Sequence, residues 1–240
     1  MFARESPRRW IASFSWLPLG VNSIDYDPNL TEEDIYHKER DIDVIYVGTP
    51  SPSRVSRVME LKKRLNIRLY GGGWQFFELT GRCWPFAIWL YKRARWMERL
   101  YPFQRVKKAT FLPRSDLIPT YQRTKIGINI HLSYGPSNMR MYQLLANGVM
   151  QICDCPEGLG QVFEVGKEVV VYHSVDEAVK LIKYYLEHDD ERKEIAAAGF
   201  RRVMQDYKRV DIFSRAMEKI KRGMVEDGIK YFKDETPLEA

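Results

Sequence analysis

The sequence predicts an α/β fold with a parallel sheet that carries helices on both faces. Three observations lead to this prediction. Short β-branched runs alternate with amphipathic helical runs along the chain. The strand candidates are continuous apolar runs, as expected for strands covered on both faces. A chain of 240 residues with 45% hydrophobic content is also long enough to bury a substantial core, in one large domain or two small ones.

Six segments are predicted to be strands, at residues 44–47, 67–70, 109–112, 126–130, 150–153 and 169–172. Residues 52–65 and 175–186 each place their apolar side chains on one helical face, which favours crossover helices between parallel strands. With right-handed crossovers, these elements form a Rossmann-like unit. The ligand of such a unit lies at the carboxyl ends of the strands.

Local signals set the ends of two helices. Ser174 and Glu177 have the spacing of a capping box and fix the start of the helix at 175–186. A further helix begins near Ser137, and Asn147-Gly148 ends it in the manner of a C-terminal cap. This helix follows the strand at 126–130 directly, so its N-terminus faces the expected ligand edge.

Charge is concentrated in one segment. The whole chain has a net charge of +6. Residues 82–125 hold eleven Lys and Arg against two acids, a net +9, and the rest of the chain is therefore net −3. Three of the six tryptophans lie in the same segment. Residues 85–101 are predicted to form an amphipathic surface helix. Core packing, contact of 84–101 with an anionic membrane surface and docking on a partner all stay open.

The compartment is expected to be reducing and cytoplasmic, with peripheral membrane contact as the alternative. Cys83, Cys153 and Cys155 cannot all pair, and their spacing matches neither a redox nor a zinc motif. Arg8-Arg9 precedes a fairly apolar run, but interruptions of that run argue against an export signal. The longest apolar stretch is far shorter than the roughly 18 to 20 residues that cross a bilayer.

The loop after strand 126–130 is a candidate anion site. It runs from His131 into a helix, where free N–H groups and the positive end of the helix dipole favour phosphate. Arg140, in the first turn, adds a full charge with a fork of donors. The alternative, at even weight, is that Ser137 only caps the helix while Arg140 points into water.

The loop after strand 44–47 has the same strand-to-helix form, with Gly48, Thr49 and Arg54. Neither G-x-G-x-x-G nor G-x-x-x-x-G-K-[ST] occurs, so the sequence encodes neither the usual dinucleotide site nor a P-loop. His131 and Asp154, each at the end of a strand, are weaker candidates, because such residues are more often structural.

Four segments carry a family signal: SNMRMYQLLANG at 137–148, CDCPEGLG at 153–160, FEVGKEVV at 163–170 and YYLEHDDER at 184–192. Together they resemble the C-terminal, donor-binding domain of GT-B glycosyltransferases, in particular the CgeB-like group. The resemblance covers about residues 16–207, with a gap over the basic aromatic segment. It implies a domain that binds a nucleotide-diphosphate sugar for glycosyl transfer, with no metal and no cofactor.

The resemblance also implies a set of donor-binding residues: Gly48, Thr49, Arg54, Pro113, Arg114, Tyr134, Gly135, Ser137, Asn138, Arg140 and Gln143. In this interpretation the main chain at Pro113-Arg114 holds the base and the loop ending at Arg140 holds the diphosphate. Gln143 stands where the family has a glutamate that binds the ribose. The neutral amide of Gln143 can still accept one hydrogen bond from a ribose hydroxyl, but without the charge of a carboxylate. A second family glutamate would fall at Gly135, so no catalytic residue and no stereochemistry are assigned.

A GT-B enzyme has two Rossmann-like domains, and only residues 1–24, which resemble the interdomain linker, precede the domain at 25–208. Within that domain, about 78–108 is an insertion, and 209–240 form a C-terminal helix and tail. The expected partner is therefore a second copy or a separate acceptor-domain subunit, which would cover Ile212, Phe213, Met217 and Ile220. The rival function is a non-catalytic nucleotide-binding or partner-binding subunit. Nucleic-acid binding through the basic segment is the weakest alternative.

Overall fold

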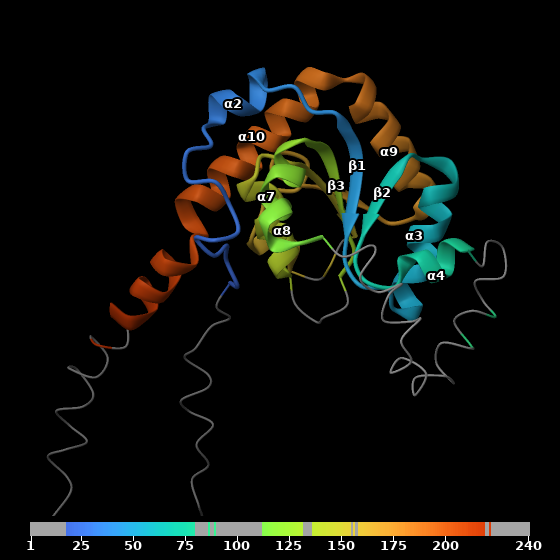
Figure 1. Ribbon diagram of the computed structural model, residues 1–240. Helices are drawn as coiled ribbons and strands as arrows, with labels where there is room; N and C mark the ends of the chain where they lie inside the picture. The colour runs from blue at the N-terminus through green and yellow to red at the C-terminus, as the bar shows by residue number, and fades with distance from the viewer. Residues whose placement is uncertain are drawn as a thin grey trace, which may run out of the picture.

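The computed structural model of the chain describes residues 18–79, 86, 89, 112–131, 136–154, 156, 158–218 and 221. Its centre is a sheet of five parallel strands in the order β2-β1-β3-β4-β5 (Figure 1). The strands are β1 (Ile42–Val47), β2 (Ile67–Tyr70), β3 (Thr124–Asn129), β4 (Met150–Asp154) and β5 (Val170–Tyr172). The predicted α/β class and the parallel pairing are confirmed.

The strand order places a topological switch point between β1 and β3. From β1 the chain crosses to β2 on one side, and it later enters β3 on the other side of β1. The loops that leave β1 and β3 therefore diverge at the carboxyl edge of the sheet. In open α/β sheets this is where a crevice opens and a ligand binds.

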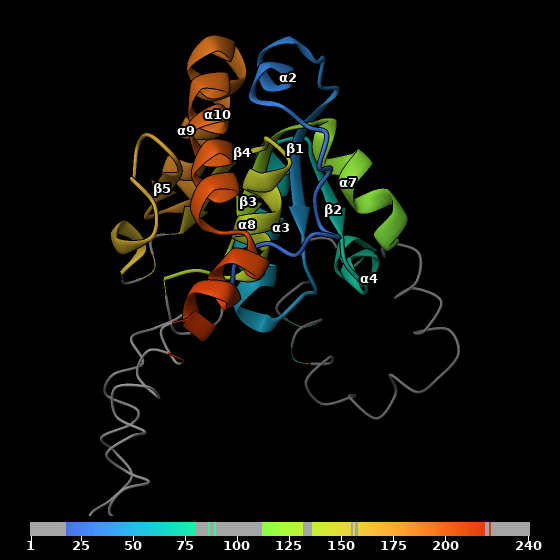
Figure 2. The ribbon, with the colours of Figure 1, turned by 90° about the vertical axis from the view of Figure 1, so that its left-hand side faces the viewer.

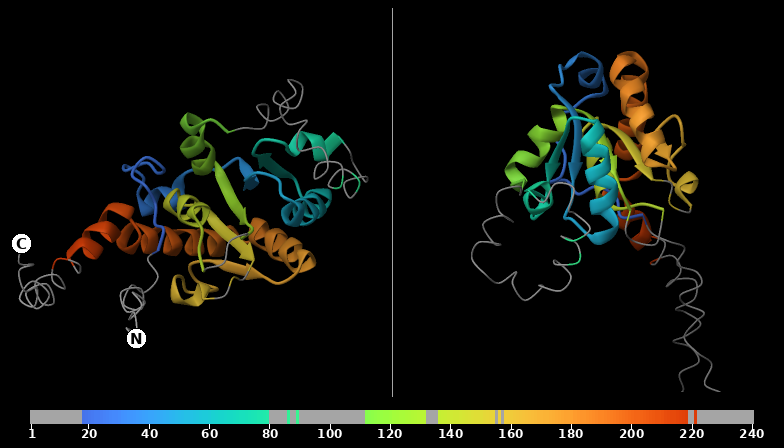
Figure 3. Two further views of the ribbon diagram at one scale, coloured as in Figure 1. Left: turned by 90° about the horizontal axis from the view of Figure 1, so that it is seen from below. Right: turned by 90° about the vertical axis from the view of Figure 1, so that its right-hand side faces the viewer.

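Helices cover both faces of the sheet (Figures 2 and 3). One face packs against α3 (Pro52–Arg64) and α9 (Val175–Glu187), and the other against α7 (Arg114–Gln122) and α8 (Met139–Ala146). Three more helices complete the layers: α2 (Glu32–His37), α4 (Trp74–Leu79) and α10 (Asp189–Asp206). A short 3-10 turn spans Leu159–Gln161.

The alternation of side chains along β1 explains the two layers. Val44 and Tyr46 pack in the cluster that contains residues of α3, whereas Ile45 packs with Tyr121 of α7 and Leu144 of α8. Because both sets are apolar, the strand is a continuous apolar run, which is the pattern that predicted a covered parallel sheet.

The predicted helix ends differ from the structure in detail. Ser174 caps α9 as expected, since its hydroxyl accepts the N–H of Glu177 at 3.1 Å. The Glu177 carboxylate, however, accepts the N–H of His173 at 2.8 Å rather than that of Ser174. Of the strand predicted at 109–112, residues 109–111 lie outside the described part, and residue 112 is not in a strand.

The basic aromatic segment falls almost wholly outside the described residues. Within 84–101 the structure describes only Phe86 and Trp89, which are exposed and stack with ring centroids 5.6 Å apart. The amphipathic helix at 85–101 and its membrane contact therefore stay predictions. None of the helices in the described part is long and apolar enough to span a membrane.

The segment before α2 and the segment after α10 meet. The N–H of Val21 donates to Tyr207 O at 2.8 Å, and the N–H of Arg209 donates to Val21 O at 2.9 Å. Residues 209–218 are helical, and Ile212 is buried in a cluster with Val21 and Tyr207. The expected exposure of Ile212 is thus wrong, because the N-terminal segment covers it.

Two other residues of that helix match the expectation. Phe213 and Met217 are 54% and 52% exposed, and Val210 adds a third exposed apolar side chain at 65%. Ile220 lies outside the described residues. The boundaries predicted at residues 24, 78, 108 and 208 stay predictions.

Gly127 allows the close packing of α8 on β3. A Cβ atom on Gly127 would lie 2.6 Å from a methyl carbon of Leu144, inside contact distance. We expect Gly127→Ala to lower the free energy of unfolding by about 1 to 3 kcal/mol, the usual cost of overpacking a core. Urea unfolding measures the change. Gly160→Ala is the matched control, because no atom lies within 4 Å of its added Cβ, and an equal loss in both variants would contradict this account.

Candidate anion-binding site

The loop after β1 is fixed by its contacts with the end of β2. The N–H of Gly48 donates to Tyr70 O at 2.7 Å, and the carbonyl of Gly48 accepts the indole N–H of buried Trp74 at 2.5 Å. Gly71 has a φ of 137°, and a Cβ there would fall 2.1 Å from Gly48 O. Only glycine fits at position 71, so the two loops lock against each other.

Arg140, from the first turn of α8, reaches across to this loop. Two of its guanidinium nitrogens lie 3.1 and 3.2 Å from the place that a Cβ of residue 48 would occupy. Its guanidinium carbon lies 5.8 Å from the ring centroid of Tyr46, a cation–π distance. Gly48 and Arg140 are thus brought together, and the alternative in which Arg140 points into water is wrong.

Arg54 approaches the same place from α3. Its Nη2 donates to Ile130 O at 2.9 Å, so it links the start of α3 to the end of β3. Burial lowers the pKa of Arg54, and the neighbouring Arg140 charge lowers it further. Burial also raises the pKa of the Tyr46 hydroxyl between the two cations, which stays neutral. The switch point therefore carries two guanidinium groups, of which that of Arg140 lies over the neutral Tyr46 ring.

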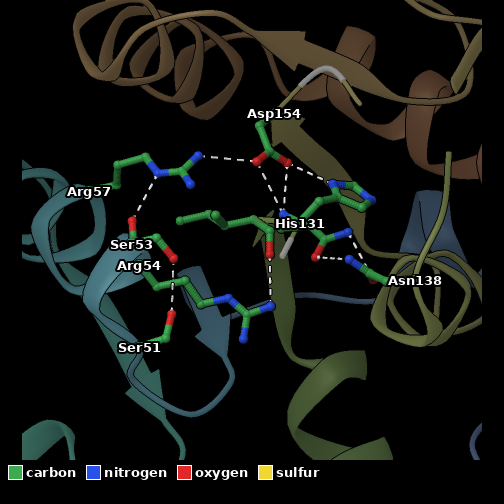
Figure 4. Close-up of polar contacts among 9 residues, drawn as sticks. Ser51, Ser53, Arg54, Arg57, His131, Asn138 and Asp154 are labelled. Carbon is green, nitrogen blue, oxygen red and sulfur yellow. Dashed lines mark hydrogen bonds and ion pairs between the residues drawn. The ribbon is translucent and has the colours of Figure 1, made fainter. Parts of the chain in front are cut away.

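A second set of polar contacts, at the same carboxyl end of the sheet, joins β3, β4 and α3 (Figure 4). The Asp154 carboxylate accepts the N–H of His131 at 2.9 and 3.1 Å, lies 2.6 Å from His131 Nδ1, and pairs with Arg57 Nη1 at 3.2 Å. Burial alone would raise the pKa of Asp154, but hydrogen bonds from the ring and main chain of His131 outweigh it. The pKa is therefore lowered.

The N-terminus of α8 is built differently from the expectation. Asn138, not Ser137, is the cap: its side chain accepts the N–H of Met141 at 3.1 Å and exchanges two hydrogen bonds with Asn129, at 3.1 and 3.2 Å. The helix accordingly begins at Met139. Ser137 is buried, and its hydroxyl shares a 2.8 Å hydrogen bond with the Tyr142 hydroxyl.

The remaining predicted site residues are more dispersed. Thr49 is exposed and Gln143 is half-buried on α8. Pro113 and Arg114 form the start of α7, whose first turn has no side-chain cap, and Arg114 pairs with Asp25 at 2.9 Å. Tyr134 and Gly135 lie outside the described residues.

Several buried polar atoms at the carboxyl end of the sheet have no hydrogen-bond partner within the described part of the chain: Tyr46 Oη, Arg54 Nε, His131 Nε2, Arg140 Nε and Tyr172 Oη. Native proteins leave few such atoms, although Arg40, Asn147 and Arg192 of the described chain have unpartnered atoms too. In the described ranges, no group of three or more His, Cys, Asp or Glu side chains could hold a metal ion.

Sequence reasoning singled out Gly48, Arg54 and Arg140, but it missed Arg57 and Tyr46. Tyr46 belongs to an apolar strand and carried no signal of its own. Arg57 is one turn after Arg54 on α3, and this spacing could have identified it. Together the fold and this edge define a Rossmann-like domain with two guanidinium groups at its switch point.

The chain belongs to the glycosyl transferase-like family, whose sequence profile matches residues 54–217. A search of curated proteins gives no match. Among solved structures, the chain is similar to HepE from Anabaena in complex with UDP, with a TM-score of 0.54 and 11% identity over 83% of this chain and 54% of that one. Its similarity to sucrose-phosphate synthase from Thermosynechococcus elongatus has a TM-score of 0.56 and 16% identity, over 91% and 55% of the two chains.

A third similar structure is the GtfA/B complex, with a TM-score of 0.52 and 13% identity over 86% of this chain and 39% of that one. At these identities the comparisons establish the fold, which is that of GT-B glycosyltransferases. The chain spans about half the length of the first two solved structures.

Asp154 should contribute to stability in a pH-dependent way. Its pKa is lowered in the folded protein, whereas an unfolded Asp titrates near about 3.9. The contribution is therefore present above about pH 4 and is lost as the pH falls through the folded pKa. We expect Asp154→Asn to destabilise the protein most at neutral pH, with a difference from wild type that shrinks in acid. Urea unfolding from pH 7 to pH 3 measures it.

The control for this experiment is Glu194→Gln, an exposed carboxyl on α10. It should show a much smaller change over the same range. A difference between Asp154→Asn and wild type that stays constant with pH would contradict the account.

Proposed function

We propose that this chain is the donor-binding domain of a glycosyltransferase that transfers a hexosyl group from a nucleoside-diphosphate sugar, without a metal ion. The observation that carries the proposal is the convergence of Arg54 and Arg140 beside Gly48 at the β1/β3 switch point. Two guanidinium groups fixed at this edge match the charge of a diphosphate. The UDP bound to HepE supports the choice of ligand class.

The chemistry required of the domain is stabilisation of a leaving group. When the bond between the anomeric carbon and the diphosphate oxygen breaks, negative charge grows on the diphosphate. Arg54 and Arg140 are already oriented by Ile130 O and by the Tyr46 ring, so they can neutralise that charge without rearranging. The fixed cations take the role that Mg²⁺ has in other transferases.

The nucleoside would lie on the side of α7 and α8. The start of α7 has no side-chain cap, so the main chain at Pro113-Arg114, with the Arg114 N–H as donor, can receive the base. Gln143, half-buried on α8, would bind one ribose hydroxyl through a neutral amide. Thr49, Asn138 and Ser137 also belong to the proposed donor set, Ser137 by supporting α8 through Tyr142, as do Tyr134 and Gly135, which lie outside the described residues.

A partner is part of the proposal. The exposed stripe of Val210, Phe213 and Met217 would be covered by a second copy or by a separate acceptor-domain subunit. The GtfA/B complex among the similar structures supports a subunit arrangement. Cytoplasmic location and membrane contact through 84–101 stay predictions. The rival function, a non-catalytic nucleotide-binding or partner-binding subunit, uses the same site for the nucleotide. It differs from the proposed function only because no sugar is transferred.

Binding of a uridine or guanosine diphosphate sugar should stabilise the folded chain. Saturation at about 100 times Kd adds roughly 2.7 kcal/mol, a Tm rise of very roughly 5 to 10 °C for this size. Arg140→Ala should weaken binding by roughly 10- to 150-fold, since a lost charge-assisted bond costs about 1.5 to 3 kcal/mol. Calorimetric titration in EDTA measures both effects.

The matched control is Arg123→Ala, which removes the same charge from an exposed ion pair with Asp41 at the opposite edge of the sheet. It should leave the affinity close to that of wild type. No binding of any nucleotide sugar, or full binding in Arg140→Ala, would refute the assignment of the site.

The isolated chain should bind donor tightly but transfer sugar slowly. Transfer needs an acceptor within about 3 to 3.5 Å of the anomeric carbon, and such positioning supplies roughly 7 to 11 kcal/mol of the barrier. A donor-consumption assay, with sizing by light scattering, measures both properties. Slow donor hydrolysis is the expected result, and a strict monomer with rapid transfer to a simple acceptor would disprove the need for a partner.

A further inference from the structure

Asp25 is a buried acid at the junction of three segments. It is 2% exposed, and its carboxylate accepts the Asn22 amide at 2.8 Å and the Arg114 guanidinium at 2.9 Å. Its carbonyl accepts the side-chain amide of Asn147, at the end of α8, at 2.9 Å. Asp25 therefore ties the segment before α2 to the start of α7 and to the end of α8.

α7 has few apolar contacts of its own. Tyr121 is the one buried residue of α7, and the helix contains Pro119. Both ends of α7 are instead held by hydrogen bonds to the segment before α2. Arg114 is held by Asp25, and Gln122 is held by Asp27 at 3.1 Å. This segment runs alongside α7 (Figure 2). The position of the first turn of α7 thus depends on Asp25.

The strength of the link comes from its buried end. Arg114 is 63% exposed, but the Asp25 side chain is only 2% exposed. A carboxylate out of water needs its charged partner, and removing one member of such a pair leaves an uncompensated charge. Arg114 is therefore held to one position by a partner that cannot move into solvent.

We propose that Asp25 is a positioning residue for the nucleoside part of the donor. It fixes, through Arg114, the main chain at Pro113-Arg114 that receives the base. This inference rests on the proposed function. Asp25 does not contact Arg54 or Arg140, the two cations proposed to bind the diphosphate. A change at Asp25 should therefore alter the affinity for the base but not the affinity for the diphosphate. The chain segment before α2 then sets nucleoside binding without touching the ligand.

Binding of UDP and of pyrophosphate should be compared in the wild type, Asp25→Asn, Arg114→Met and the double variant. We expect each single variant to weaken UDP binding by about tenfold, which corresponds to about 1.4 kcal/mol. The double variant should be no weaker than the singles, because all three lose the same link. Pyrophosphate affinity should change less than about twofold. Arg114→Lys should restore part of the UDP affinity, since an ammonium can pair with the buried carboxylate.

Asp27→Ala is the control, because it removes the acceptor of the Gln122 amide, releases the far end of α7 and should leave UDP binding unchanged. Arg114→Met keeps the test decisive if Asp25→Asn fails to fold, since Arg114 is largely exposed. Equal loss of UDP and pyrophosphate binding would overturn the proposal by showing a purely structural role. Unchanged UDP binding in Arg114→Met would also overturn it. Wild type that binds pyrophosphate but not UDP, or neither, would overturn the proposed function first and this inference with it.

Discussion

The approach of the Arg140 guanidinium to the main chain at Gly48 is the constraint on which the rest of the site depends. A Cβ atom at position 48 would lie 3.1 to 3.2 Å from the guanidinium nitrogens and 3.1 Å from the Tyr46 hydroxyl, so these side-chain ends would have to give way for any other residue. The loop cannot yield easily, because its carbonyl is bound by Trp74 and its N–H is bound to Tyr70 O. The carboxyl ends of β1 and β3 are thereby held in one arrangement.

The same constraint brings the Arg54 and Arg140 cations close together. The charge of Arg140 helps to lower the pKa of Arg54, and both side chains have an Nε atom without a partner in the described chain. The Tyr46 ring and Ile130 O hold the two guanidinium groups in place. Prior arrangement of positive charge in this way is how a site can favour a growing negative charge.

The sheet and two helices could be predicted from the sequence because their signals are local. Continuous apolar runs identify β1, β2, β3, β4 and β5, and Ser174 fixes the start of α9. The cap of α8 was assigned one residue early, since Ser137 and Asn138 are both good capping residues. The choice between them depends on Tyr142, which draws Ser137 into the core.

Contacts between distant segments could not be predicted. Arg57 and Asp154 are 97 residues apart, and Asp25 and Arg114 are 89 apart. An acid in a loop has no periodicity that reveals its partner. The two candidate loops were recognised separately, but their meeting follows from the strand order β2-β1-β3, which no local pattern encodes. Ile212 was misplaced for the same reason, because Val21 covers it.

The backbone bonds between Val21 and the residues around Lys208 have a mechanical consequence. The chain enters and leaves this domain at one parallel bridge, so tension applied across its two ends acts on that bridge before it reaches the sheet. Residues 209–218 leave the bridge as a helix, and Ile212 of that helix packs with Val21 and Tyr207, so the same force would also act on this apolar cluster.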